Sequence, residues 1–184
     1  MFELKSVGTK ILETDRLILR RFEKDDANNM FNNYASNPNV TKFLTWQPHK
    51  TVKDSENIIN IWINEYSNLD FYQWCIELKE IKQIIGSISV VNIWKEMDKC
   101  EIGYCLSEEY WHKGITSEAL KKIIEFLFNV ADAKTIVAKH DVNNINSGLV
   151  MKKCGMEFQC IIKKATKNSN GDHVDCAYYE IKNN

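Results

Sequence analysis

Hydrophobic and polar residues alternate along several short segments of the chain, a pattern that predicts β-strands. Near the N-terminus, Leu17 and Leu19 are flanked by charged residues within residues 15–22. The runs between residues 71 and 106 have hairpin-like separations, so they are predicted to form an antiparallel meander. The last two runs are joined by Asn170-Gly171, a strong turn signal. The predicted strands after the first one are 71–78, 83–93, 99–106, 135–139, 157–164 and 174–182.

Four other segments repeat apolar residues every three or four positions, which predicts amphipathic helices. The clearest is residues 116–131, where Glu118 lies in the first turn and is expected to pair with Lys122. The others begin near Asp25 and end at Asn37-Pro38, or cover about 53–66 and 144–153. The predicted order is one strand, two helices, three strands, a helix, a strand, a helix and two strands.

With 184 residues, the chain has the length of one ordinary domain. We therefore expect a single α/β domain over residues 1–184, with its core at about 11–182. The net charge of −1 is spread over both halves of the chain, which disfavours a nucleic-acid or membrane surface. No run approaches the roughly 20 apolar residues that span a bilayer. Because the N-terminal residues also lack an apolar signal segment, a cytoplasmic location is expected.

Cysteine and histidine residues give no sign of a metal site. The six cysteines include no Cys-x-x-Cys pair, and most stand inside apolar runs, where a free cysteine behaves as a small hydrophobic residue. Reduced, buried thiols are therefore expected. The four histidines lack the close spacing of a zinc site, so no metal is implied.

The sharpest chemical signal lies between Tyr110 and Glu118, where a predicted strand leads into the clearest helix. Gly114 permits a close backbone approach there, and the first N–H groups of a helix have no internal partners, so they can bind a pyrophosphate. The alternative for a single glycine is an ordinary strand-to-helix turn. The segment has neither the Gly-Lys-Ser/Thr ending of a P-loop nor the Gly-x-Gly-x-x-Gly of a Rossmann turn.

Several segments together resemble one known family. The run from Trp111 to Leu120 is similar to motif A of the GNAT N-acetyltransferases, and in particular to the ribosomal-protein N-terminal (RimJ/RimL-type) branch, whose usual form is Trp-Gly-Lys-Gly-Tyr-Ala-Thr-Glu-Ala-Leu. The sequence departs from that form at His112 and Thr116, where the branch carries glycine and a small residue. The resemblance covers nearly the whole chain. Other elements of the branch follow in the same order: Thr14–Arg20, Glu101–Tyr104, Asn144–Ser147 and Lys153–Met156, the last with Met156 in place of an aromatic residue.

This resemblance implies a GNAT-type domain with a central, mixed, mostly antiparallel and twisted sheet of about seven strands, flanked by about four helices. It also implies acetyl-CoA as the co-substrate, with its pantetheine arm inserted between two diverging parallel strands. An N–H near Cys105 or Leu106 would then polarise the thioester carbonyl. Carried over residue by residue, the contacts to the arm fall on the backbone of Tyr104, Cys105 and Leu106, and those to the pyrophosphate on Lys113, Gly114, Ile115, Thr116 and Ser117.

Acetyl transfer requires an unprotonated amine and, after the attack, a proton for the departing thiolate. The resemblance makes Glu101 the candidate base, and the alternative is a solvated or salt-bridged strand residue. Ser147 stands where the branch carries a serine that replaces the tyrosine acid of many GNAT enzymes, and the alternative is an ordinary first-turn residue. Asn144 would contact the pantetheine arm or order water, unless it only caps the helix. Cys105 is not expected to act as a covalent nucleophile, because no histidine is paired with it in the sequence.

Two further groups of residues stay without a site assignment. Lys152 and Lys153, late in the last helix, are expected on a solvated face, the alternative being the 3′-phosphate of CoA. Five aromatic residues are expected mainly in the core, the alternative being an acceptor pocket. These are Trp46, Trp62, Tyr72, Trp74 and Trp94.

The sequence therefore predicts an acetyl-CoA-dependent N-acetyltransferase that modifies a primary amine by direct attack in a ternary complex. The first expectation for the acceptor is a protein N-terminus of the ribosomal-protein type. The second is a small amine, such as a polyamine or an amino-bearing antibiotic. A catalytically silent acyl-CoA-binding module is an alternative from a different class. The sequence leaves open which amine is used and whether the protein is a monomer or a homodimer.

Overall fold

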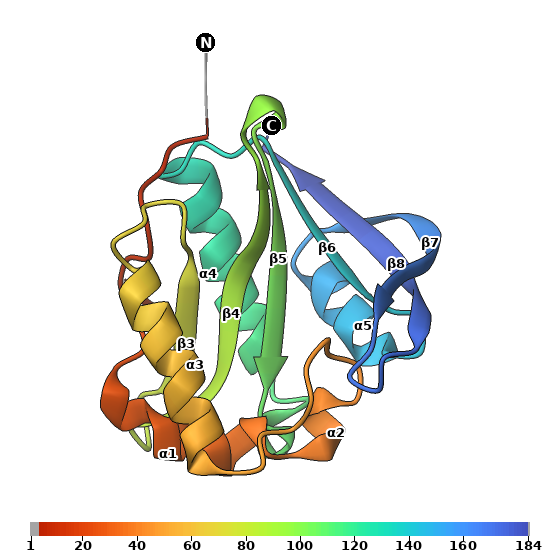
Figure 1. Cartoon of the computed structure of the whole chain (residues 1–184). Coiled ribbons are helices and arrows are strands. Elements are labelled where there is room, and N and C mark those ends of the chain that lie inside the picture. The colour runs from red at the N-terminus through yellow and green to blue at the C-terminus, as the bar shows by residue number, and fades with distance from the viewer. Residues whose placement is uncertain (1–3, 184) are drawn as a thin grey trace.

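One continuous sheet organises the part of the chain that the computed structural model describes, residues 4–183. It has eight strands in the order β1-β2-β3-β4-β5-β6-β8-β7. Neighbouring strands are antiparallel except β5 and β6, which run parallel. Figure 1 shows β5 and β6 close together at one end and apart at the other. The strands are β1 (Leu12–Glu13), β2 (Leu17–Arg20), β3 (Gln73–Leu78), β4 (Gln83–Trp94), β5 (Lys99–Leu106), β6 (Thr135–Asp141), β7 (Glu157–Lys167) and β8 (His173–Lys182).

Helices lie on both faces of this sheet, with α3 in front of it and α4 behind it in the view of Figure 1. Helix α3 begins at a capping box, in which the Thr51 and Asp54 side chains accept hydrogen bonds from each other's backbone N–H. The helices are α1 (Ala27–Met30), continued by a π-helical turn (Phe31–Ala35), α2 (Pro38–Thr41), α3 (Val52–Glu65), α4 (Ile115–Asn129) and α5 (Ile145–Lys153), and 3-10 turns cover Lys24–Asp26, Lys95–Met97 and Glu108–Tyr110.

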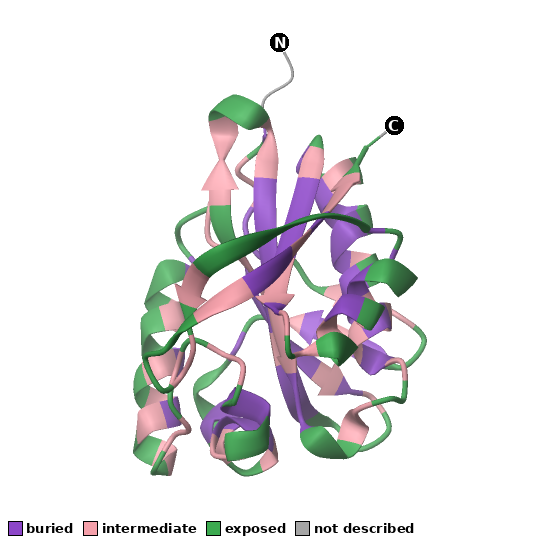
Figure 2. Cartoon of the chain, turned by 90° about the vertical axis from the view of Figure 1, so that its right-hand side faces the viewer, coloured by how far each residue is buried: buried purple, intermediate pink, exposed green. Residues whose placement is uncertain are grey.

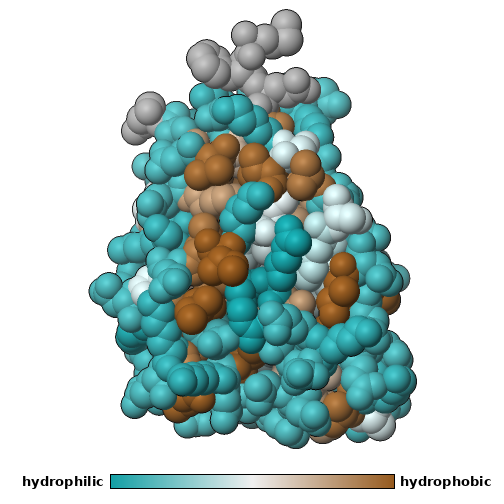
Figure 3. Space-filling model, turned by 90° about the vertical axis from the view of Figure 1, so that its left-hand side faces the viewer, coloured by the Kyte–Doolittle hydropathy of each residue, from teal (hydrophilic) through white to brown (hydrophobic). Residues whose placement is uncertain are grey.

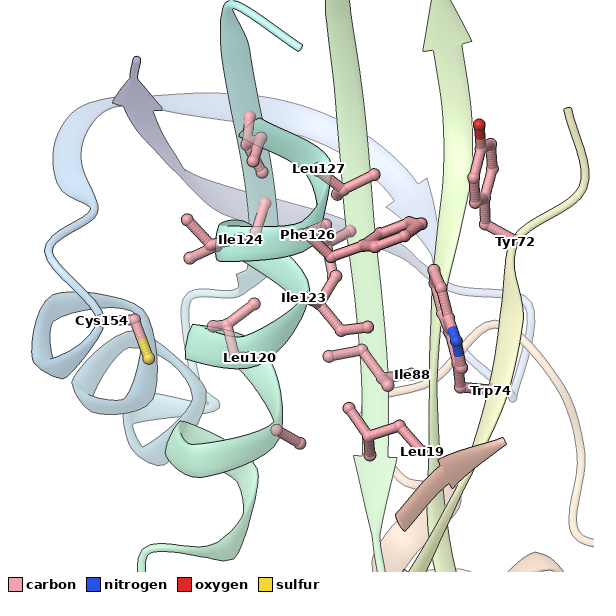
Figure 4. Packing of buried hydrophobic residues seen from close by; sticks show 14 of the residues in the cluster. Leu19, Tyr72, Trp74, Ile88, Leu120, Ile123, Ile124, Phe126, Leu127 and Cys154 are labelled. Atoms are coloured by element: carbon pink, nitrogen blue, oxygen red, sulfur yellow. The ribbon is translucent and has the colours of Figure 1, made fainter. Parts of the chain in front are cut away.

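The larger part of the hydrophobic core lies between α4 and the sheet. Figure 4 shows Ile123 and Phe126 of α4 directed toward Ile88 and Trp74 on the strands. The rings of Phe126 and Trp74 meet edge to face, with their centroids 5.7 Å apart. Each fully buried side chain of this size stabilises the fold by roughly 1.5–3 kcal/mol. Because α4 buries one face in this way, its apolar residues recur at helical spacing.

A second, smaller core lies on the opposite face of the sheet, under α1 and α3. It contains Phe22, Tyr34, Ile59 and Ile84, all of which are buried. The sheet thus lies between two hydrophobic layers, one on each of its faces. Outside these layers, the last strands are less covered, and Figure 2 shows β7 exposed along most of its length while part of β8 is buried.

The predicted fold class, a mixed sheet with helices on both faces, is confirmed. Every predicted strand is present, and the sheet gains β1, which is two residues long. The predicted helix from Asp25 to Asn37 is interrupted by the π-helical turn. The predicted pair of Glu118 with Lys122 is wrong, because Glu118 pairs with Arg16 while Lys122 pairs with Glu125.

The surface of the described residues offers no continuous apolar face on the side drawn in Figure 3, where hydrophobic patches are separated by hydrophilic side chains. No helix in residues 4–183 has the length and apolar character needed to cross a membrane. All six cysteines are unpaired, and four of them are buried while Cys160 is exposed. Burial raises the pKa of Cys100 to about 12 and that of Cys154 to about 11, so both thiols stay protonated near neutral pH.

Candidate functional site

The parallel strands β5 and β6 separate halfway along their length. Their pairing covers only three positions and ends at Glu101 and Val137, although β5 continues to Leu106 and β6 to Asp141. On its other side, β5 stays paired with β4 up to the Gly86–Leu106 position. The second half of β5 therefore has no strand partner on the side facing β6.

The alternation of an antiparallel ladder shows which backbone groups of β5 face this opening. Ser107 N donates to Ile85 O at 2.7 Å, and these two groups flank the Leu106–Gly86 pair. That pair is therefore of the kind that exchanges no hydrogen bonds, and the N–H of Leu106 points away from β4. The same holds for Tyr104, two residues earlier. The carbonyl of Leu106 accepts a hydrogen bond from Nε1 of Trp111 at 2.9 Å. A ligand at this end of the strand can therefore bind the N–H of Leu106 but not its carbonyl.

The turn before α4 is built around two left-handed residues, His112 with φ 61° and Gly114 with φ 76°. Gly114 is the N-cap of α4 and provides no side-chain cap. The first intrahelical bond runs from Glu118 N to Gly114 O at 3.0 Å, so the N–H groups of the three residues between them have no partner within the helix. These groups lie at the positive end of a 15-residue helix, where an anion is stabilised.

Two cationic side chains flank this turn. A methyl group on Gly114 would lie 3.6 Å from Nη2 of Arg16 and 3.7 Å from Nζ of Lys153. Arg16 also donates from Nη1 to the carbonyl of Lys113 at 3.0 Å. The ammonium of Lys113 instead lies over the ring of Tyr110, 5.1 Å from its centroid. The positive charge beside the turn thus comes from distant parts of the chain and not from the lysine within it.

Helix α5 lies close to β6 because residue 148 is a glycine. A methyl group on Gly148 would lie only 2.6 Å from Nε2 of His140 on β6, so a larger residue would displace either this imidazole or the helix. At the start of α5, Oδ1 of Asn144 accepts a long hydrogen bond of 3.4 Å from Ser147 N. The expected cap is therefore present, and it uses only the oxygen of the Asn144 amide.

Ser147 and Tyr104 connect α5 to the open half of β5. Oγ of Ser147 donates to the phenol oxygen of Tyr104 at 3.0 Å, and that phenol donates to the carbonyl of Ser147 at 3.0 Å. Burial raises the pKa of Tyr104 well above its usual value, so the phenol is protonated at neutral pH. The pair places two hydroxyl groups at the point where β5 and α5 meet.

Glu101 is buried and ion-paired. Its Oε1 lies 2.9 Å from Nζ of Lys139 on β6, and its Oε2 accepts from Nδ2 of Asn92 at 2.8 Å. Only 5% of the Glu101 side chain is exposed, which excludes the solvated alternative expected from the sequence and leaves the salt-bridged one. Its neighbour in the opening, Cys105, shares a 3.3 Å contact with Oγ of Ser87, and burial raises the pKa of the Cys105 thiol. A protonated thiol is a weak nucleophile, in agreement with the expectation for Cys105.

Two cavities meet at this place. The first, of about 290 Å³, lies between the open half of β5, the turn before α4 and the start of α5. The second, of about 510 Å³, lies along β5 from Glu101 to Cys105, with Lys139 in its wall and with α1, α3 and the segment between α2 and α3 around it. We name them the turn cavity and the sheet cavity. The residues that line both are Phe43, Leu44, Tyr104, Cys105, Asn144 and Ser147.

The structure brings most of the predicted site residues together. Glu101 lines only the sheet cavity, and Lys113 lines neither, although its carbonyl is held by Arg16. Sequence reasoning missed Arg16, which lies beside the turn before α4, and Asn39 and Val40 of α2, which line the turn cavity. Nothing in the short α2 segment distinguishes it from other turns. Trp46 and Trp62 line the sheet cavity, whereas Tyr72 and Trp74 are in the core. The predicted residues that line the turn cavity are Tyr104, Cys105, Leu106, Gly114, Ile115, Thr116, Ser117, Asn144 and Ser147.

Comparison with known proteins gives consistent matches over this same region. A family model described as acetyltransferase (GNAT) domain matches residues 16–157. The chain is 31% identical over 171 residues to the uncharacterized N-acetyltransferase p20 of Bacillus licheniformis, with 92% of this chain and 94% of p20 covered. It is 29% identical over 168 residues to the ribosomal protein uS5-alanine N-acetyltransferase of Escherichia coli (strain K12), with 85% and 84% covered.

Among solved structures, the microcin C7 self-immunity acetyltransferase MccE in complex with acetyl-CoA and AMP superposes with a TM-score of 0.83 at 24% identity. The match covers 98% of both chains.

Proposed function

The chain belongs to the GNAT acetyltransferase family, an acetyl-CoA-dependent group of N-acetyltransferases, and we propose that it acetylates a primary amine by direct attack in a ternary complex. The observation that carries this proposal is the meeting of two cavities at one set of residues. A direct transfer needs the thioester and the amine in contact, with each held by its own surface. The turn cavity is assigned to acetyl-CoA and the sheet cavity to the acceptor.

The residues of the turn cavity fit acetyl-CoA at both of its ends. The turn before α4 offers unpartnered N–H groups beside Arg16 and Lys153, a combination suited to a pyrophosphate. The open half of β5 offers the backbone of Tyr104 and Leu106 to an amide-bearing arm, as an additional strand would be bound. The bound thioester supplies an activated acetyl group to the shared end of the cavities.

The proposed step exchanges a carbon–sulfur bond for a carbon–nitrogen bond. The lone pair of the acceptor nitrogen forms a bond to the acetyl carbonyl carbon, whose oxygen takes up the electron pair. The N–H of Leu106 faces the opening and is placed to stabilise this oxyanion. The carbon–oxygen double bond then reforms, the sulfur leaves as a thiolate, and the nitrogen releases a proton.

Ser147 is the proposed proton donor to the departing sulfur, and its oxygen takes up in exchange the proton that the acetylated nitrogen releases. Its hydroxyl must first leave Tyr104, which costs about one neutral hydrogen bond, on the order of 1 kcal/mol. Tyr104 keeps its own bond to the Ser147 carbonyl during this rotation. We propose that Glu101, at the wall of the sheet cavity, accepts a proton from the incoming ammonium.

The identity of the acceptor is the less determined part of the proposal. A relative at 29% identity is named as an alanine N-acetyltransferase of ribosomal protein uS5, which supports a protein N-terminus as one acceptor. A small amine is the second candidate, because the sheet cavity, of about 510 Å³, has the size of a small-molecule site. A cytoplasmic location is part of the proposal, since the unpaired cysteines are typical of a reducing compartment.

The experiment that tests the function is release of free thiol from acetyl-CoA in the presence of a panel of N-terminal peptides and small amines. We expect release that depends on the acceptor, and a Ser147→Ala variant with slower turnover but nearly unchanged affinity for acetyl-CoA. Binding of CoA without release for any acceptor would favour a silent binding module. An unaltered Ser147→Ala rate, under conditions where chemistry limits turnover, would remove this residue from the mechanism.

A further inference from the structure

The charged residues of the sheet cavity nearly cancel. Its carboxylates are Glu101 and Asp141, and its one lysine, Lys139, is paired with Glu101 at 2.9 Å. Oδ1 of Asp141 accepts from the backbone and side-chain nitrogens of Asn143 at 2.8 and 2.9 Å. Burial lowers the pKa of His49, another residue of the wall, which favours its neutral form. An entering ammonium therefore meets a single carboxylate, that of Asp141, that has no cationic partner among the described residues.

Much of the remaining wall is apolar and comes from the helices and loop that cover the sheet. The side-chain amide of Gln47 donates to the carbonyl of Ser169, which connects the segment after α2 to the turn between β7 and β8. Trp46 of the segment after α2 and Thr166, on β7 just before the turn, both contribute to the wall. A ligand in this cavity is thus surrounded on several sides and loses most of its hydration. The apolar side chains of the wall include Met30, Phe43, Leu44, Trp46, Ile58 and Trp62.

Two buried side-chain atoms of the wall, the phenol oxygen of Tyr34 and Nε2 of His140, lack a hydrogen bond of normal geometry among the described residues. Tyr34 has no exposed surface, and the side chain of Ser87 is near its phenol without forming a hydrogen bond of normal geometry. Burial raises the pKa of Tyr34 well above its usual value, so it remains a neutral donor. Native proteins rarely leave such an atom unsatisfied unless water or a ligand completes it. These two atoms are a second, independent sign that the sheet cavity is built to hold a molecule.

From these observations we propose that the acceptor is a primary monoamine whose nitrogen is attached to an apolar or aromatic group, and that polycations are poor acceptors. The inference rests on the proposed function. Each ammonium of a polyamine or aminoglycoside beyond the first would lose its hydration without gaining a carboxylate, and Lys139 would repel it. A monoamine needs one carboxylate, and its apolar part gains from leaving water.

The test compares kcat/KM for four acceptors at saturating acetyl-CoA, with thiol release as the signal. Phenethylamine and a Phe-Ala-Ala amide represent apolar monoamines from a small-molecule and a peptide source, and spermidine and kanamycin represent polycations. We expect at least one of the monoamines to exceed both polycations by more than about tenfold. The better of the two monoamines identifies the source. A polycation that matches or exceeds both monoamines overturns the proposal.

A Lys139→Met variant tests the charge argument. Removal of this cation leaves a second carboxylate unpaired, so the ratio of kcat/KM for spermidine to that for phenethylamine should rise by about tenfold. The ratio cancels any change in the chemical step that both acceptors share. Lys182→Met is the matched control, because Lys182 forms an ion pair with Glu180 and does not line the sheet cavity. An unchanged ratio in the Lys139 variant contradicts the proposal.

Calorimetric titration of the CoA complex with phenethylamine and with spermidine separates this inference from the proposed function. Preferential binding of phenethylamine in the absence of thiol release for any acceptor would uphold the inference and reject the transferase proposal. Preferential binding of spermidine would overturn the inference, whether or not transfer occurs.

Discussion

Arg16 and Glu118 lie 102 residues apart in the chain, and Nε and Nη2 of the arginine approach Oε2 of the glutamate to 2.7 and 2.6 Å. The other glutamate oxygen accepts from Oγ1 of Thr14 and from the backbone of Arg16. Because Nη1 of Arg16 also holds the carbonyl of Lys113, the segment before β2 fixes the turn that leads into α4. The proposed pyrophosphate site therefore depends both on the turn before α4 and on Arg16, which precedes β2.

Substitution of Arg16 by alanine is expected to raise KM for acetyl-CoA by roughly tenfold, about 1.4 kcal/mol, with little change in kcat. The reason is that the turn loses its anchor and the site loses a cation beside Gly114, whereas the reacting end is untouched. Steady-state kinetics with a fixed acceptor gives both constants. Lys5→Ala, which removes a surface ion pair with Asp132, is the control and should leave KM unchanged. An unaltered KM in a folded Arg16 variant would exclude this role.

Glu118 should make stability depend on pH. Its burial opposes ionisation, but hydrogen bonds from Thr14 and Arg16 outweigh burial and lower the pKa of Glu118. A lowered folded-state pKa means that its contribution to stability is fully present above the ordinary glutamate pKa of about 4.3 and is lost as the pH falls through the lower folded value. Unfolding midpoints measured between pH 7 and 3 should therefore fall more steeply for the natural protein than for Glu118→Gln. Parallel pH profiles for the two proteins would contradict this account.

His112 has a left-handed backbone conformation, with φ 61°, which suits the glycine usual at this position in the branch that the sequence resembles. The left-handed conformation costs a residue with a Cβ roughly 1–2 kcal/mol. Glycine avoids this cost, but its greater conformational freedom in the unfolded chain cancels part of the benefit. The substitution His112→Gly should accordingly raise the free energy of unfolding by about 0.5 kcal/mol. Urea denaturation measures the change. A loss of stability would mean that contacts of the imidazole outweigh the strain of its backbone.

Tyr34 and Tyr66 provide a matched pair of buried phenols. The hydroxyl of Tyr66 accepts from Phe22 N at 2.8 Å and donates to the carbonyl of Gln73 at 3.0 Å. The hydroxyl of Tyr34 has the Ser87 side chain near it but forms no hydrogen bond of normal geometry. Replacement of Tyr66 by phenylalanine should cost about 1–3 kcal/mol, because it leaves buried backbone groups unpaired. The Tyr34→Phe variant should be at least as stable as the natural protein. Thermal unfolding that shows a large loss for Tyr34→Phe would indicate that its phenol is bonded in the folded state.

The sequence predicts the elements of the sheet well because each one has its own apolar period. The bounds of β5 are reproduced, and α4 differs from its prediction by one or two residues at its ends. The π-helical turn at Phe31–Ala35 could not be foreseen, since its residues keep a helical spacing and the change concerns only the hydrogen bonds. The two-residue strand β1 is too short to carry any period.

The sequence predicts only part of the site. The turn around Gly114 has a local signature, and the resemblance to a family extends it to Asn144 and Ser147. The partner of Glu118 was predicted four residues away, on the same helix. The actual partner, Arg16, is distant in the sequence, so rules based on local spacing do not identify it. The ion pair of Glu101 with Lys139 likewise depends on the parallel pairing of β5 and β6. The residues near Glu101 in the sequence do not predict this pairing.

The most direct test of the central claim, that the turn before α4 holds acetyl-CoA, is calorimetric titration of acetyl-CoA into Gly114→Val. Valine at φ 76° distorts the turn and lies against Arg16 and Lys153. Gly171→Val is the control, because Gly171 has φ 87° with no atom within 4 Å of the added methyl group, and it lies in the turn between β7 and β8. We predict that Gly114→Val loses more than about tenfold in affinity while Gly171→Val stays near the natural value. Equal affinity of a folded Gly114→Val protein and the natural one would contradict the account.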